Sequence, residues 1–202
     1  MKKLRVGVLI SGRGSNLQAL IQACAKPEFP AEISLVISNV ADAGGLNHAA
    51  ATGIPTIILA HEKFPGREAF DREMDAKLRE AGIEFVCLAG FMRLLSAPFV
   101  RDWEGKIINI HPSLLPAFKG LNVHQQALDA GVRISGCTVH YVVPELDSGP
   151  PILQAAVPVE PHDNADSLAA RVLEAEHRIY PQALKMVAEN RVRLENGRAV
   201  FA

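Results

Sequence analysis

The chain has 202 residues, 49% of them hydrophobic and 21% charged, which is enough apolar sequence for one globular domain with a substantial core. Its 21 basic and 22 acidic side chains leave a formal charge of −1, which argues against a nucleic-acid-binding protein and favours a small-molecule ligand. The three cysteines are widely spaced, and neither a CxxC nor an HExxH pattern occurs, so we expect neither a disulfide framework nor a metal site.

The first residues, MKKLRVGVLISGRGSN, lack the cleavage region of a signal peptide. No segment has the apolar length needed to span a bilayer. Together with the reduced cysteine pattern, these features predict a soluble, cytoplasmic protein.

Short runs rich in Val, Ile and Leu alternate with amphipathic stretches through the first half, which predicts βαβ units and a parallel sheet. The strands are expected at residues 5–11, 33–38, 56–59 and 85–89, and the helices at 16–25, 46–51, 67–81 and 98–102.

The second half has a different pattern. Apolar runs at 137–143 and 152–159 are joined only by PELDSGPP, which favours antiparallel neighbours. Residues 163–190 are predicted to be mostly helix, with a kink or a fresh start at Pro181, and a hairpin through Asn196-Gly197 ends the chain. We therefore expect one α/β domain over 1–202, with a Rossmann-like, mixed but mostly parallel sheet flanked by helices.

The segment IINIHPSLLP, residues 107–116, places Asn109 and His111 on one face of an expected strand that ends at Pro112. Ligands of open α/β sheets bind at the carboxyl ends of the strands, so these two side chains are candidates for chemistry. Residues 112–120 would form a long loop beside them. The alternative is that both are hydrogen-bonded core side chains.

The segment SGRGSN, residues 11–16, lies between the first strand and its helix, where glycines and a helix N-terminus favour phosphate. It is neither a dinucleotide fingerprint nor a P-loop, because the third glycine and the GK[ST] ending are missing. An ordinary tight turn with Ser15 or Asn16 as N-cap is expected here as well.

The segment ELDSGPP places Asp147 in a turn, where its carboxylate could simply cap that turn. If the turn folds beside His111, the carboxylate would favour the imidazolium form. Asn109, His111 and Asp147 would then suit an oxyanion. Because no Ser or Cys stands at a nucleophile elbow, the chemistry that fits is acyl transfer to an external nucleophile.

Five segments in order resemble the phosphoribosylglycinamide formyltransferases, a folate-dependent family of purine synthesis: SGRGSN, LAGFMRLLS, NIHPSLLPAFKG, GCTVHYVVPELDSGPPILQ and AEHRIYP. The resemblance implies a formyltransferase fold and transfer of the formyl group of 10-formyltetrahydrofolate, a cosubstrate, to the amino group of 5-phosphoribosylglycinamide on the route to IMP. It also implies direct attack by the amine, no metal, no nucleic-acid or membrane partner, and a monomer or weak homodimer.

The resemblance also implies roles for individual residues. Asn109 would hold the formyl oxygen, protonated His111 would stabilise the oxyanion and help to protonate the departing folate nitrogen, and Asp147 would sustain the imidazolium. Asp147 would also organise a water that relays protons.

The N-terminal half would bind the ribonucleotide and the C-terminal half the folate. The ribonucleotide phosphate would lie on Gly14, Ser15 and Asn16, and the ribose on Glu176, whose alternative is a solvent-facing helical glutamate. The folate would lie against Arg67, Met92, Arg93, Leu94, Leu95, Asn109, Val143, Pro144, Glu145, Leu146 and Asp147. Arg67 would otherwise be a solvated surface charge.

Two positions depart from the family pattern. Leu173 stands where some relatives carry a polar residue near the phosphate, and Asn122 where others carry histidine, so neither is given a role. His124 and His140 are also left unassigned. Methionyl-tRNA formyltransferase and formyltetrahydrofolate hydrolase share the fold, but each is expected to carry a further domain. A hydrolase-like enzyme and a non-catalytic nucleotide-binding module remain the alternatives.

Overall fold

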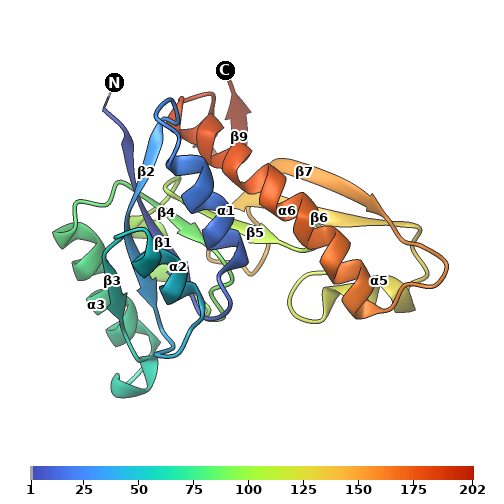
Figure 1. Cartoon of the computed structure of the whole chain (residues 1–202), viewed down its shortest axis with the longest axis horizontal. Helices are drawn as coiled ribbons and strands as arrows, with labels where there is room; N and C mark the ends of the chain where they lie inside the picture. Colours follow the sequence, from blue (N-terminus) through green and yellow to red (C-terminus); the bar gives the residue numbers. More distant parts are fainter. Residues whose placement is uncertain (1) are drawn as a thin grey trace.

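The computed structural model describes residues 2–202, which form a mixed sheet of seven strands in the order β3-β2-β1-β4-β5-β6-β7 (Figure 1). The first five strands in that order run parallel, and β6 and β7 are antiparallel additions. The strands are β1 Leu4–Ile10, β2 Ala31–Ser38, β3 Thr56–Ile58, β4 Phe85–Leu88, β5 Ile107–His111, β6 Ile134–Tyr141 and β7 Pro151–Pro158. The predicted fold class is confirmed.

Helices cover both faces of the parallel part of the sheet. The bounds are α1 Ser15–Cys24, α2 Gly45–Ala51, η1 His61–Lys63, α3 Arg67–Glu80, α4 Ala97–Asp102, α5 Val123–Asp129 and α6 Ala165–Ala188. Alternate side chains of β1 separate the two cores: Val6, Val8 and Ile10 pack in the cluster shared with α1 and α6, whereas Leu9 packs in the cluster with α3 and α4. This two-sided burial explains the nearly continuous apolar strands.

Helix α6 packs against the sheet over most of its length, and Figure 1 shows it lying beside α1. Asn164 and Ser167 form a capping box at its start. The helix continues through Pro181, so a fresh start at this residue was wrong. The adjacent Tyr180 is fully buried and donates its hydroxyl to the backbone oxygen of Leu88, 2.8 Å away, which ties the helix to β4.

Helix α5, which follows the 112–120 loop, was not predicted at all. The predicted C-terminal hairpin is present as β8 Val192–Glu195 and β9 Arg198–Phe201, and both Asn196 and Gly197 have positive φ as a tight hairpin turn requires. Within residues 2–202, no helix combines the length and the apolar character needed to cross a membrane.

Candidate active site

The carboxyl end of β5 carries Asn109 and His111, which are paired across the antiparallel ladder with His140 and Thr138 of β6. Ile108 and Ile110 point into the core shared with α6, as the alternation predicts. His111 is only 5% exposed, so its ring is held in a polar niche rather than in open solvent.

The ring of His111 lies between two oxygen atoms that can only accept hydrogen bonds. Its Nε2 is 2.9 Å from the backbone oxygen of Phe118, and its Nδ1 is 3.5 Å from Oδ2 of Asp147. Because a carbonyl cannot donate, Nε2 carries a hydrogen in this arrangement. An imidazole with a hydrogen on each nitrogen would satisfy both oxygens, and such a ring is a cationic donor.

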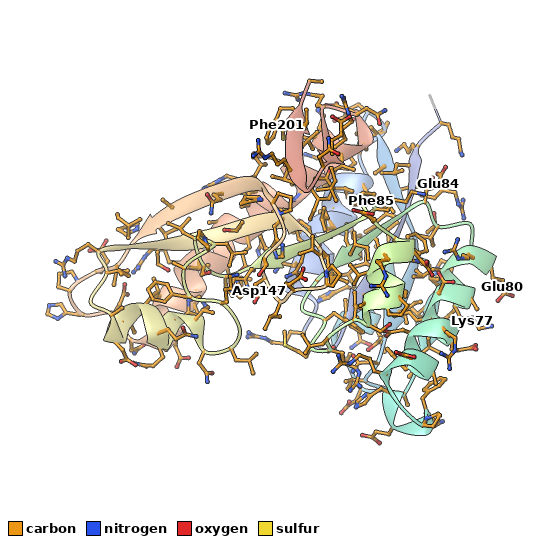
Figure 2. The ribbon with its side chains drawn as sticks, turned by 180° about the vertical axis from the view of Figure 1, so that it is seen from behind. Lys77, Glu80, Glu84, Phe85, Asp147 and Phe201 are labelled. Carbon is orange, nitrogen blue, oxygen red and sulfur yellow. The ribbon has the colours of Figure 1, made fainter. Side chains whose placement is uncertain are left out.

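The turn that carries Asp147 lies against the end of β6, and Figure 2 shows the Asp147 side chain near the middle of the molecule. A Cβ atom on Gly149 would stand 1.7 Å from the backbone oxygen of Tyr141, so only glycine permits this close approach. The Asp147 carboxylate accepts a hydrogen bond of 2.9 Å from the N–H of Gly120, which belongs to the 112–120 loop and not to the turn of Asp147 itself. The local alternative, a carboxylate that caps its own turn, is not the arrangement seen.

Asn109 is oriented by a side chain that the sequence had left unassigned. Nδ1 of His140 is 2.8 Å from the backbone oxygen of Tyr141, so Nδ1 is the donor and Nε2 is free to accept. The Asn109 Nδ2 lies 3.3 Å from this Nε2. Burial lowers the pKa of His140, which favours the neutral ring that this contact needs. The second hydrogen on Asn109 Nδ2 is left for a ligand.

The 112–120 loop is held over β5 by polar side chains of the antiparallel strands. Thr138 accepts from the Leu115 N–H at 3.0 Å and donates to the Ser113 oxygen at 2.7 Å. Gln154 donates to the Leu115 oxygen at 2.9 Å. The loop therefore reaches His111 and Asp147 because β6 and β7 position it.

The β1–α1 turn differs from its predicted form. Gly14, with φ of 76°, occupies the N-cap position and no side chain caps the helix, so the expected cap by Ser15 or Asn16 was wrong. The first N–H groups of an α-helix have no partner within the helix. Without a side-chain cap, those of α1 are available to an anion.

Glu176 of α6 is buried against this turn, at 6% exposure, so the alternative of a solvent-facing glutamate was wrong. It accepts a hydrogen bond of 2.6 Å from Nδ2 of Asn16. Burial raises the pKa of Glu176 to about 7, against the opposing effect of the Asn16 hydrogen bond. Oδ1 of Asn16 is buried and has no hydrogen-bond partner among residues 2–202, so it is open to a ligand.

The segment after β4 contributes apolar surface beside this turn. Met92 and Leu94 are 69% and 51% exposed, and Leu146 of the Asp147 turn is 52% exposed. The Met92 N–H donates to Oγ of Ser11 at 2.8 Å, which joins this segment to the β1–α1 turn. Such exposed apolar side chains are typical of a surface that a ligand covers.

The two arginines of the predicted folate side lie near α3. The Arg93 guanidinium stands 5.6 Å from the centre of the Phe70 ring. Arg67 opens α3 and is exposed, and its charge, like that of Arg93, attracts the buried carboxylate of Asp71. Burial is the larger effect on Asp71 and raises its pKa.

Comparison with known proteins shows which family the sequence and fold resemble. The model of the formyl transferase family matches residues 4–184. The chain is 56% identical over 198 residues to the trifunctional purine biosynthetic protein adenosine-3 of Bos taurus, covering 98% of this chain and 20% of that protein. It is 46% identical over 196 residues to phosphoribosylglycinamide formyltransferase of Escherichia coli (strain K12), covering 97% of this chain and 92% of that one.

A solved structure agrees closely. Glycinamide ribonucleotide transformylase 1 of Symbiobacterium toebii superposes with a TM-score of 0.96 at 46% identity, over 98% of this chain and 94% of that one. The chain spans only about a fifth of the length of the trifunctional relatives it matches. The family match and these identities nevertheless extend across nearly all its residues, and the chain therefore belongs to the formyl transferase family.

Proposed function

We propose that this chain transfers the formyl group of 10-formyltetrahydrofolate to the amino group of 5-phosphoribosylglycinamide, a step in de novo purine synthesis. The observation that carries the proposal is the placement of His111 between Asp147 and the Phe118 carbonyl, with Asn109 on the same face of β5. The relatives that this chain matches over 92% and 93% of their own length are named phosphoribosylglycinamide formyltransferase, which supports the choice of acceptor.

In the proposed reaction, the amine nitrogen attacks the formyl carbon and the formyl oxygen becomes an oxyanion. Asn109 donates to this oxygen with the Nδ2 hydrogen that His140 does not use. Protonated His111 stabilises the oxyanion, and Asp147 keeps that ring positively charged and orders a water that relays protons. The carbon–nitrogen bond to the folate then breaks, and the proton lost by the amine is delivered to the departing nitrogen with the help of His111.

This reaction places one requirement on the 112–120 loop. The Nε2 hydrogen of His111 is engaged by the Phe118 oxygen in the present arrangement. For that hydrogen to reach the formyl oxygen, the Phe118 carbonyl must move away by the length of a hydrogen bond or be displaced by the substrate. Phe118 has a φ of 53°, an uncommon backbone conformation for a bulky residue, so we expect the loop to leave this position at modest cost.

The binding roles follow from the same proposal. The phosphate lies on the N–H groups of Gly14, Ser15 and Asn16, and the ribose hydroxyls meet Glu176. The pterin lies on the backbone of the 92–95 and 143–147 segments, whose exposed apolar side chains suit a flat heterocycle. Arg67 and Arg93 supply positive charge on the same side. Residues 1–202 act as one catalytic domain, cytoplasmic and monomeric or weakly dimeric.

The test is a reaction with both substrates, in which the deformylated folate is followed by absorbance, and a second reaction without the ribonucleotide. We expect folate turnover only when the ribonucleotide is present, together with formylated ribonucleotide as product. Turnover without the acceptor would identify a hydrolase instead. Ribonucleotide binding with no turnover under any condition would identify a non-catalytic nucleotide-binding module.

A further inference from the structure

A concave surface lies outside the site, between two of the helices that cover one face of the sheet. This groove of about 580 Å³ is bordered by α1 and α6, which lie side by side in Figure 1. One of its lining residues is Ser15, the first residue of α1. It also contains His177 and Arg178, which directly follow Glu176. The groove therefore meets the ribonucleotide side of the proposed site.

Positive charges outnumber negative ones in the lining of the groove. Its lining includes Lys26, Arg178 and Lys185 but only one carboxylate, that of Glu28. The whole chain has a formal charge of −1, so this positive surplus is local. Glu189 lies 3.7 Å from Lys185 and offsets part of its charge. Among residues 2–202, neither Lys26 nor Arg178 has a carboxylate within 4 Å, so the surplus rests mainly on these two cations.

The lysines are too far from the site to touch a ligand bound there. Lys26 follows the last residue of α1, Cys24, and so lies beyond the end of the helix opposite to Ser15. Lys185 lies nine positions after Glu176 within α6, which corresponds to about 14 Å along the helix axis. At such separations two charges interact through solvent, over a range of about 30 Å at low ionic strength but only about 8 Å at physiological ionic strength. Their effect on a ligand must therefore depend on salt.

We propose that the groove between α1 and α6 is an electrostatic approach path, which draws the phosphate of the ribonucleotide toward the N-terminus of α1. A cleft whose charges are mostly of one sign raises the local concentration of an oppositely charged ligand and its rate of association. This inference rests on the proposed function, because that function supplies the phosphate-bearing substrate. The uncharged part of the lining includes Gln18, Gln22 and Gln182. These side chains keep the groove hydrated and do not hold the ribonucleotide in a single orientation.

The test is the double variant Lys26→Glu with Lys185→Glu, which leaves Arg178 and every residue of the proposed site intact. Its matched control is Arg101→Glu with Lys106→Glu. These two residues are also exposed, and they lie at the end of α4 and just before β5, at the opposite edge of the sheet from His111. Both double variants change the net charge equally. Steady-state kinetics are measured for each substrate at low and high ionic strength.

We expect kcat/KM for the ribonucleotide to fall about five- to tenfold in the groove variant at low ionic strength, and the loss to disappear at high ionic strength. The kcat and the KM for the folate should stay at their wild-type values, as should all constants of the control variant. An equal loss in both variants, a loss that persists in high salt, or no loss would each overturn the approach path. These outcomes leave the proposed function standing, which fails only if the wild-type protein transfers no formyl group.

Discussion

The ribonucleotide side and the transfer side of the site are built in different ways. On the ribonucleotide side, one turn of the chain meets one helix, and the contact is closed by the buried pair Asn16 and Glu176. On the transfer side, three separate segments converge: the end of β5, the 112–120 loop and the turn at Asp147. Phe118, Asn122 and Asp147 all have positive φ without being glycine. The first side therefore depends on one buried contact between two segments, and the second on the convergence of three segments.

The side chains proposed to act on the formyl group lie on the transfer side, so substitutions there should have the largest effects on turnover. We expect His111→Ala to lower kcat by roughly 10²-fold or more, because it removes the cationic donor that meets the oxyanion. Ribonucleotide affinity, measured by equilibrium binding, should change little. The control His162→Ala alters an exposed histidine outside the site and should keep wild-type turnover. Near wild-type turnover in His111→Ala would remove the proposed mechanism.

The next effect separates charge from shape at the Asp147 turn. Asn at position 147 can still accept from the Gly120 N–H but carries no charge to sustain the His111 cation. We expect Asp147→Asn to lower kcat by roughly 30-fold, less than the 10²-fold or more of a lost acid–base group, because the His111 ring is kept. The KM for the ribonucleotide should stay nearly constant. The control is Asp129→Asn, a change of the same chemistry on the exposed side of α5.

An equal loss of turnover and of ribonucleotide binding in Asp147→Asn would contradict this separation. That outcome would mean that the carboxylate holds the loop in place and does little for the chemistry. Circular dichroism and a thermal unfolding curve would then show whether the turn itself had been disrupted.

The difference between local signals and contacts between distant residues explains what could be predicted from the sequence. Apolar runs and turn residues predicted the parallel strands and the hairpin, because those signals are local. Helix α5 was missed, since it is short and begins after Asn122 without a side-chain cap. The break expected at Pro181 did not occur, because burial of Tyr180, Ala183 and Leu184 stabilises the continuous helix. Within the site, the role of His140 depends on strand register, which no local motif encodes.

The burial of Glu176 was also hidden from the sequence, and it makes a prediction about pH. Its pKa, raised by burial to about 7, lies above the value of an unfolded glutamate, so the folded protein holds this proton more tightly. The contribution of Glu176 to the free energy of unfolding is therefore highest at low pH, where Glu176 is protonated, and falls as the pH rises toward and through 7. Between pH 5 and pH 8 the free energy of unfolding should fall by roughly 2 kcal/mol from this group.

Glu176→Gln removes that titration while it keeps an oxygen for Asn16. In urea unfolding, the variant should therefore gain stability over the wild type as the pH is raised from 5 to 8. Glu174→Gln is the matched control, because Glu174 is an exposed neighbour on the same helix. Parallel pH profiles for wild type and Glu176→Gln would show that Glu176 ionises in the folded protein as freely as in the unfolded chain.

The smallest effect we expect tests the close packing of the β1–α1 turn against α2 on the ribonucleotide side. Gly14 has a φ of 76°, and a Cβ there would stand 2.4 Å from the Cα of Gly45, whereas a Cβ on Gly12 would meet nothing within 4 Å. Gly14→Ala must therefore move the N-terminus of α1 away from α2. We expect the KM for the ribonucleotide to rise about tenfold, which corresponds to about 1.4 kcal/mol, the scale of a strained backbone.

The control is Gly12→Ala, which should leave that KM unchanged, since the backbone at Gly12 needs no special conformation. Because Asn109, His111 and Asp147 lie outside this turn, kcat at saturation should survive in both variants. Equal KM values in the two variants would mean that the close contact with α2 does not set the phosphate site.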